Sequence, residues 1–94
     1  RDVSDEEFAR AMHDSYHEVA GVAQRLGVSR QSVYRRMASS GLYRKASELP
    51  EPELREAVRE CGGDTLAASR LLRVSASGLR SRLRSDAPGL TAGA

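Results

Sequence analysis

The sequence has few aromatic residues and almost no cysteine. Its 94 residues include no Trp, one Phe and three Tyr, so a core must be built mainly from aliphatic side chains. The single cysteine, Cys61, excludes an internal disulfide bond and cannot form a zinc site without further thiols, and it fits a reducing, cytoplasmic setting. No apolar run is long enough for a membrane span or a signal peptide. Because the chain begins at Arg1 rather than Met, we expect it to be a fragment of a longer protein.

Charge is unevenly distributed along the chain, although the net charge is only +2. Residues 25–45 contain six basic residues and no acidic one, and residues 70–84 contain five basic residues and no acidic one. Acidic residues gather in 2–18 and 48–64. This alternation predicts two electropositive surfaces.

The composition, rich in Ala, Leu, Val, Arg and Glu, predicts an all-α fold of about six helices. In the first half, Ser4 and Glu7 have the spacing of a capping box. A second helix starts near Val19 and ends at Gly27, and Ser29 caps a third. Helical spacing places these side chains in the first core: Phe8, Ala11, Met12, Val19, Val22, Ala23, Leu26, Val33 and Met37.

The sequence of the second half predicts three more helices. Pro50 and Pro52 mark the start of the first, Gly62-Gly63 its end, and Asp64 and Ser75 cap the next two. The inward positions are Leu54, Ala57, Val58, Cys61, Leu66, Ala68, Leu71, Leu72, Leu79 and Leu83. On the last helix, Arg80, Arg82 and Arg84 are expected to point outward.

A shift of 46 residues aligns the two halves without a gap. Identical residues then coincide at caps, turn and core: Glu7 with Glu53, Ala11 with Ala57, Leu26 with Leu72, Val28 with Val74, Ser29 with Ser75, and Arg36 with Arg82. We therefore expect two three-helix units related by an internal repeat, over residues 4–41 and 50–85. Residues 42–49 are expected to form a linker with Arg44 and Lys45 exposed, and residues 86–94 a disordered tail.

The stretch from Val19 to Met37 has the pattern of a helix-turn-helix: a short helix, a glycine turn and a second helix with a polar, basic outer face. The second helix of such a motif can lie in the major groove of DNA. The side chains expected on its outer face are Arg30, Gln31, Tyr34, Arg35 and Arg36.

These motifs resemble the Fis-type DNA-binding domain, which also forms the C-terminal module of bacterial enhancer-binding transcription activators. The first unit resembles its turn and recognition helix through AQRLGVSRQSVYRRM, residues 23–37, and the second its earlier part through CGGDTLAASRLL, residues 61–72. The resemblance implies that Ser29, Arg30 and Ser32 face base edges or nearby phosphates. It places Tyr34, Arg35 and Arg36 on the DNA backbone.

The two units depart from the family pattern at different places. The first has Tyr16-His17 where Gly-Gly is usual, whereas the second has Arg73 at the turn glycine and Ala76 at the base-contacting arginine. A non-glycine residue held left-handed at position 73 costs on the order of 1 kcal/mol. We therefore expect the first unit to read sequence. The second is expected to contact mainly phosphate, through Ser75, Ser77, Arg80 and Arg82.

These observations predict sequence-specific binding of double-stranded DNA by a bacterial transcription regulator, cytoplasmic and associated with the nucleoid. The resemblance implies a pair of recognition helices, supplied by a homodimer or by the two units as an intrachain pseudo-dimer. It also implies an ATPase domain upstream if the chain belongs to an activator. The alternatives are a protein-interaction or dimerisation module with little or no DNA binding, and an architectural DNA binder with little sequence preference.

No enzymatic activity is expected. The sequence shows no nucleophile–base pair and no phosphate-binding glycine loop. His13 and His17 lie four residues apart, but no further Cys or His is available to complete a metal site. We expect no metal, no cofactor, no small-molecule substrate and no membrane partner.

Overall fold

The computed structural model describes residues 2–86, which form six α-helices and one 3₁₀ turn and contain no strand within that range. This confirms the predicted all-α fold. Asp86 ends the last helix, and the remainder of the expected tail, residues 87–94, lies outside the described residues. The helices are α1 (Asp5–Asp14), α2 (Val19–Leu26), α3 (Arg30–Ser40), η1 (Ala46–Glu48), α4 (Glu51–Glu60), α5 (Thr65–Leu72) and α6 (Ala76–Asp86).

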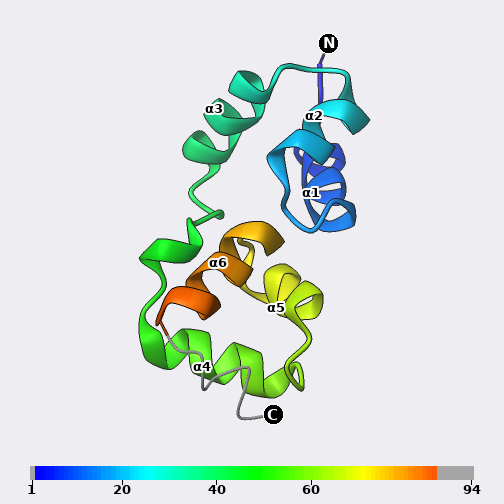
Figure 1. The fold of residues 1–94 in the computed structure, drawn as a ribbon. Coiled ribbons are helices and arrows are strands. Elements are labelled where there is room, and N and C mark those ends of the chain that lie inside the picture. The colour runs from blue at the N-terminus through cyan, green and yellow to red at the C-terminus, as the bar shows by residue number, and fades with distance from the viewer. Residues whose placement is uncertain (1, 87–94) are drawn as a thin grey trace.

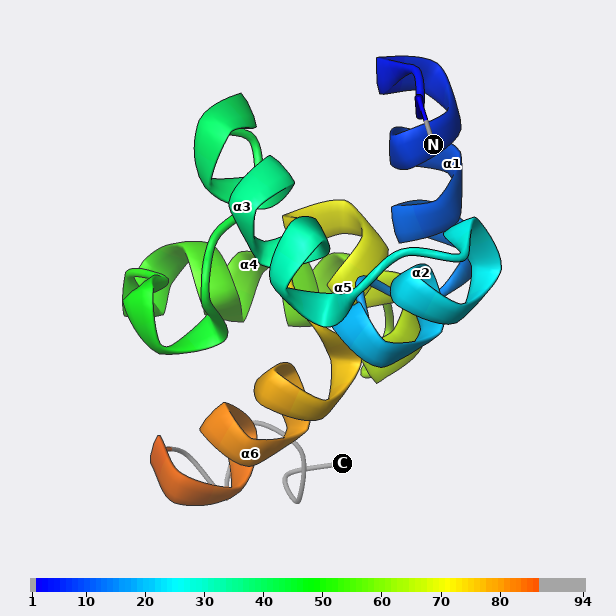
Figure 2. The same cartoon turned by 90° about the horizontal axis from the view of Figure 1, so that it is seen from above.

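The helices form two groups stacked along one long axis (Figure 1). The first unit consists of α1–α3 and the second of η1 and α4–α6, and the described chain measures 45 × 19 × 17 Å. Figure 2 looks at the molecule from above, with α4 and α5 behind the first unit. Each unit has its own buried apolar cluster, so the fold has two small cores.

The first core is built around Met12, Val22 and Val33, each at most 1% exposed and each from a different helix. The linker also contributes: the ring of Tyr43 packs edge-on against Phe8, with 5.9 Å between ring centroids and 76° between ring planes. Gly21 lets α2 approach the end of α1 closely, because a Cβ there would meet the Cβ of Ser15 at 3.2 Å.

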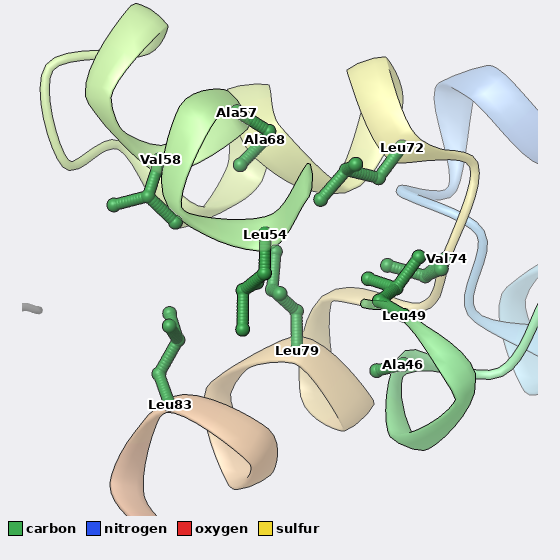
Figure 3. Close-up of a cluster of buried hydrophobic side chains, with 10 residues drawn as sticks. All are labelled: Ala46, Leu49, Leu54, Ala57, Val58, Ala68, Leu72, Val74, Leu79 and Leu83. Atoms are coloured by element: carbon green, nitrogen blue, oxygen red, sulfur yellow. The ribbon is translucent and has the colours of Figure 1, made fainter. Parts of the chain in front are cut away.

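The second core is centred on Leu54 and Leu79, which point toward each other from α4 and α6 (Figure 3). Ala46 and Leu49, from the segment expected to be only a linker, are buried in the same cluster. The prediction that Leu71 is buried is wrong, because its side chain is 54% exposed. Leu72, one residue and about 100° further round the helix, is buried as predicted.

The predicted caps at Ser4 and Asp64 and the predicted helix end at Gly27 are present. The Ser4 hydroxyl accepts from the Glu7 N–H at 3.0 Å, the Asp64 carboxylate accepts from two N–H groups of α5, and Gly27 ends α2 with φ 67°. Arg73 ends α5 in the same left-handed conformation, with φ 57°. The expected strain at this non-glycine position is therefore present.

The two units have equal helix lengths at a constant offset. Each of α4, α5 and α6 begins and ends 46 residues after α1, α2 and α3. Turn hydrogen bonds follow the same offset: the N–H of His17 donates to the carbonyl of Met12, and that of Gly63 to the carbonyl of Val58. The internal repeat itself stays a prediction, which this regularity supports.

Candidate nucleic-acid interface

The start of α3 is fixed by a cap and by two apolar anchors. The Ser29 hydroxyl oxygen accepts from the Ser32 N–H at 3.1 Å, and it donates to the Ser32 hydroxyl at 3.0 Å. Val33, 1% exposed, and the half-buried Met37 pack into the first core. Because these two residues set the rotation of the helix about its axis, the residues between them point elsewhere.

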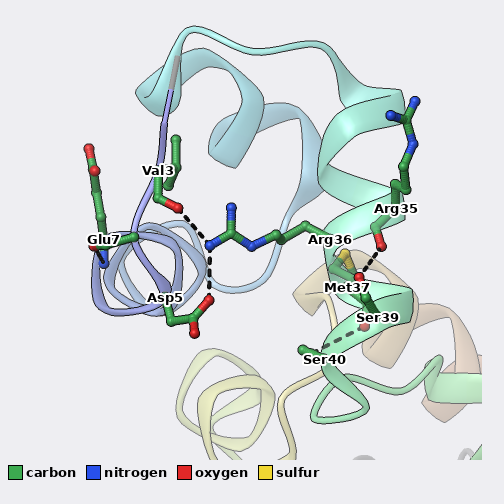
Figure 4. A network of polar contacts seen from close by, with 9 residues as sticks. Val3, Asp5, Glu7, Arg35, Arg36, Met37, Ser39 and Ser40 are labelled. Carbon is green, nitrogen blue, oxygen red and sulfur yellow. Dashed lines mark hydrogen bonds and ion pairs between the residues drawn. The ribbon is translucent and has the colours of Figure 1, made fainter.

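The outer face of α3 carries free polar groups. Arg30, Gln31 and Arg35 are exposed, and Tyr34 is 59% exposed. Across the described chain, none of these four side chains has a hydrogen bond or an ion pair with another residue. Figure 4 shows Arg35 extended away from α1. The helix therefore presents two guanidinium groups, an amide and a phenol to an external partner.

Arg36 does not lie on this outer face, contrary to the prediction. Its guanidinium donates to the Val3 carbonyl at 2.6 Å and to the Asp5 carboxylate at 2.9 Å, and it lies 5.3 Å from the Phe8 ring centroid (Figure 4). Arg36 is three residues beyond Val33, so it emerges beside the buried stripe. It holds α3 against the segment that precedes α1.

Arg82 has the corresponding position in the second unit and is also turned inward. Its guanidinium donates to the carbonyls of Ala46 and Leu49, each at 2.8 Å. Leu49 is 46 residues after Val3, so the two arginines bind equivalent carbonyls. Arg36 and Arg82, which coincide under the 46-residue shift, therefore hold equivalent backbone segments in their own units.

The start of α6 is covered by the first unit. The Ala76 N–H donates to the Tyr16 carbonyl at 3.1 Å, and the Ala76 side chain is 2% exposed. The Ser77 hydroxyl donates to the Glu18 carboxylate at 2.8 Å, and the Ser75 hydroxyl accepts from the Gly78 N–H at 3.1 Å.

Arg80 is the remaining residue predicted for phosphate contact in the second unit. Its side chain is exposed and forms no hydrogen bond or ion pair with any other of residues 2–86. The other three, Ser75, Ser77 and Arg82, already have intramolecular partners. Glu18 adds a carboxylate close to this end of α6, where it would repel a DNA phosphate.

The contact region between the units, here called the seam, comprises Tyr16, His17, Glu18, Arg70, Arg73, Ala76 and Ser77. The guanidinium of Arg70 stacks on the Tyr16 ring at 4.0 Å, and its Nε donates to the His13 carbonyl at 2.9 Å. Sequence reasoning missed these contacts because they join positions more than fifty residues apart. The only prior signal was the departure of Tyr16-His17 and Arg73 from glycine.

Backbone strain is concentrated at the seam. Within the described range, Tyr16, His17 and Arg73 are the only non-glycine residues with positive φ, at 51°, 60° and 57°. Their counterparts 46 residues away are Gly62, Gly63 and Gly27, which adopt positive φ without a Cβ clash. Each of the three costs about 1–2 kcal/mol, so the surrounding contacts must stabilise them.

His17 is a buried histidine in this strained turn. Its side chain is 4% exposed and its ring centroid lies 5.8 Å from that of Tyr43, but its Nδ1 has no partner among the described residues. Burial, together with the smaller effect of the nearby charges of His13, Arg73 and Arg70, lowers the pKa of His17 from 6.5 to about 4. The imidazole is therefore neutral at pH 7.

A groove of about 610 Å³ lies between α3 and α6. Tyr34 and Met37 line it from α3, and Ser75, Gly78 and Ser81 line it from α6. Its basic lining residues are Arg44, Lys45, Arg73 and Arg82, and no described acidic residue lines it. Arg44 is held by Glu53 through contacts of 2.9 and 2.5 Å, whereas Lys45 is exposed.

The described residues contain no group of three or more His, Cys, Asp or Glu that could hold a metal ion. None of the described helices combines the length and the apolar character needed to cross a bilayer. Comparisons with protein-family models, curated proteins and solved structures give no match to this chain. The assignment of the site therefore depends on its own geometry and on the motif residues.

Proposed function

We propose that this chain binds duplex DNA site-specifically as part of a bacterial transcription regulator, with α3 in the major groove. The observation that carries the proposal is the exposed start of α3, where Arg30, Gln31 and Arg35 are free while Val33 and Met37 anchor the opposite side. Arginine can pair bidentately with a guanine edge, and Gln with adenine. The resemblance to Fis-type domains supports the same role and a cytoplasmic, nucleoid-associated location.

The groove beside α3 suits the phosphate backbone that flanks a major groove. The side chain of Lys45, which lines the groove, has no hydrogen bond or ion pair among the described residues, and serine hydroxyls line the α6 side. Contacts of this kind position a protein on DNA without reading sequence, and they weaken as salt is raised. Tyr34 also lines this groove and, in this proposal, contacts the same backbone.

The second unit supports the first in this proposal and does not read bases itself. In a helix-turn-helix, residues at the start of the recognition helix contact base edges. At the start of α6, however, Ala76 is buried with its N–H bonded to the Tyr16 carbonyl of the first unit, and Ser77 is bound to Glu18. Arg80 is the side chain of this unit that remains free to contact phosphate.

The arrangement favours a homodimer over an intrachain pseudo-dimer. Adjacent major grooves on one face of DNA are separated by ~34 Å. Because α3 and α6 line the same groove, their facing surfaces lie much closer together than that. A second recognition helix at the required spacing would therefore come from a second chain.

The test is a mobility-shift titration on DNA selected from a random pool, with Arg30→Ala and the control Arg55→Ala. Both variants remove one exposed arginine, but Arg55 lies on α4 and pairs with Glu51. We expect Arg30→Ala to weaken binding by roughly 5- to 150-fold, equivalent to ~1–3 kcal/mol, and to relax preference at one base pair. Arg55→Ala should bind like the unchanged chain. Equal affinities for all three proteins would overturn the proposal.

A protein-interaction or dimerisation module is the second candidate. The coverage of α6 favours it, since a helix that resembles a recognition helix is used there for contact between units. This candidate predicts no shift of any duplex at low salt, and a self-association or partner complex detectable by sedimentation. A steep decrease of DNA affinity with salt would exclude it.

A further inference from the structure

A second cavity, of about 510 Å³, lies on the side of the seam where α1 meets α5. Both units and the linker contribute to it, whereas no residue of α3 or α6 lines it. The cavity shares His17 and Arg73 with the groove beside α3, but its other lining residues come from α1, α5 and the linker, so its occupant would be distinct from a duplex bound at α3. The polar groups that matter here are Arg10, Asp14, His17, Tyr43, Arg70 and Arg73.

Positive charge in this cavity is incompletely neutralised. Three arginines line it, whereas the one carboxylate, that of Asp14, lies 3.4 Å from Nδ1 of His13. The guanidinium groups of Arg10 and Arg73 have no hydrogen bond or ion pair with any residue in the described range. Arg70 uses its Nε for the His13 carbonyl, which leaves its outer nitrogens available.

Two of the residues that line this cavity have a strained backbone conformation. His17 and Arg73 both have positive φ, a conformation that glycine would adopt without strain, as Gly63 and Gly27 do at the equivalent positions. The ring of Tyr16, the third strained residue, is explained by its stacking with Arg70. Neither Nδ1 of His17 nor the guanidinium of Arg73 has a polar partner among the described residues, and both residues line the cavity.

We propose that this cavity binds a small multivalent oxyanion of the phosphate type. Arg73 and Arg70 would donate to its oxygens, and Arg10 would approach from α1. Guanidinium groups match the geometry of phosphate oxygens and donate two hydrogen bonds at once. Because α1 and α5 both contribute, the bound anion links the two units.

The experiment is a thermal-unfolding and NMR titration of the 94-residue chain with inorganic phosphate, at constant ionic strength made up with chloride. We expect the melting temperature to rise with phosphate and the His17 imidazole nitrogen signals to shift. At a phosphate concentration about ten times Kd, the folded-to-unfolded ratio should rise about elevenfold. A sulfate arm distinguishes a general oxyanion site from one selective for phosphate.

The decisive variant is Arg73→Gly, because glycine accepts φ 57° without strain. It should fold at least as stably as the unchanged chain in chloride, yet lose the response to phosphate. Arg10→Gln, on the exposed face of α1, should weaken the response, and Arg35→Ala, on α3, should leave it intact. The proposal fails if chloride stabilises the chain as much as phosphate, or if Arg73→Gly and Arg10→Gln both respond fully.

Discussion

Arg35 and Arg36 are adjacent in the sequence and use the same functional group differently. Arg35 extends into solvent, whereas Arg36 is bound to the Val3 carbonyl and packs over Phe8. A guanidinium bonded to a carbonyl and stacked on a ring stabilises the fold, and an exposed one has little effect on it. Of these two neighbouring residues, Arg36 therefore stabilises the fold, whereas Arg35 is available to bind a partner.

We predict that Arg36→Ala lowers the free energy of unfolding by about 1–3 kcal/mol, because it removes hydrogen bonds made by a charged group and a contact with the Phe8 ring. Arg35→Ala should change it by less than ~0.5 kcal/mol. Urea denaturation followed by circular dichroism measures both. Equal losses in the two variants would contradict this assignment of Arg36.

The stability of the chain depends on pH because of His17. Burial and neighbouring positive charge lower its pKa to about 4 in the folded state, against about 6.5 when unfolded. The unfolded chain therefore binds the proton more readily than the folded chain. As a result, His17 leaves the free energy of unfolding unchanged above pH ~6.5 and lowers it as the pH falls toward 4. The loss amounts to at most about 3 kcal/mol.

This loss is measured by urea denaturation between pH 7 and pH 4. His17→Asn should remove most of the pH-dependent decrease, since Asn tolerates positive φ and does not titrate. His13→Ala is the control, because His13 is exposed and should leave most of the decrease in place. The same pH profile in His17→Asn and in the unchanged chain would show that other groups cause the decrease.

At the scale of elements, α3 and α6 have the same length and the same type of cap but different surroundings. Arg30 and Ala76 hold the first position of the two helices, 46 residues apart. Arg30 is exposed, whereas Ala76 is buried where its N–H meets the Tyr16 carbonyl. The absence of an arginine from position 76 therefore has a steric reason.

We predict that Ala76→Arg does not confer base reading on α6. The larger, charged side chain has no room at the seam, so it should lower the free energy of unfolding by at least ~2 kcal/mol. Arg30→Ala, the reciprocal change in α3, should leave stability within ~0.5 kcal/mol. Thermal unfolding compares the two variants. Unchanged stability in Ala76→Arg would mean that α6 is not held against the first unit.

Features set by near neighbours in the sequence could be predicted from the sequence. The caps at Ser29, Asp64 and Ser75 and the left-handed Arg73 depend on contacts within a few residues, and each is present as expected. The exposed Arg30, Gln31 and Arg35 also lie where helical spacing puts them.

Features set by distant contacts could not be predicted. Hydropathy assigns Arg36 and Arg82 to the outer face, but their long side chains reach carbonyls more than thirty residues away. Helical spacing likewise does not reveal that Ala76 meets Tyr16, because that contact depends on how the units dock. The exposure of Arg30, Gln31 and Arg35 on α3 was therefore predictable, whereas the inward turn of Arg36 and the coverage of α6 were not.

At the scale of the whole molecule, the two cores are joined through the seam. The hydrogen bond from the Ala76 N–H to the Tyr16 carbonyl connects the units there, beside the stack of Arg70 on Tyr16. The relative position of α3 and the second unit depends on these few contacts. Amide exchange at Ala76 therefore reports on docking, separately from unfolding of either core.

We predict that Tyr16→Gly keeps both cores folded and loosens the units. Glycine accepts the left-handed turn, but it removes the ring on which Arg70 stacks. Protection of the Ala76 amide should fall by about tenfold or more, while that of Leu54 and Val33 amides changes little. Hydrogen-exchange NMR measures all three. Unaltered protection at Ala76 would show that the stack does not hold the units together.

The segment between α3 and α4 determines how the protein can be divided for study. Tyr43 covers Phe8 in the first core, whereas Ala46 and Leu49 belong to the second and supply the carbonyls that bind Arg82. A fragment that stops at Gly41 would leave Phe8 uncovered, and one that starts at Pro50 would deprive Arg82 of both acceptors. Two self-sufficient halves would have to be separated between residues 43 and 46.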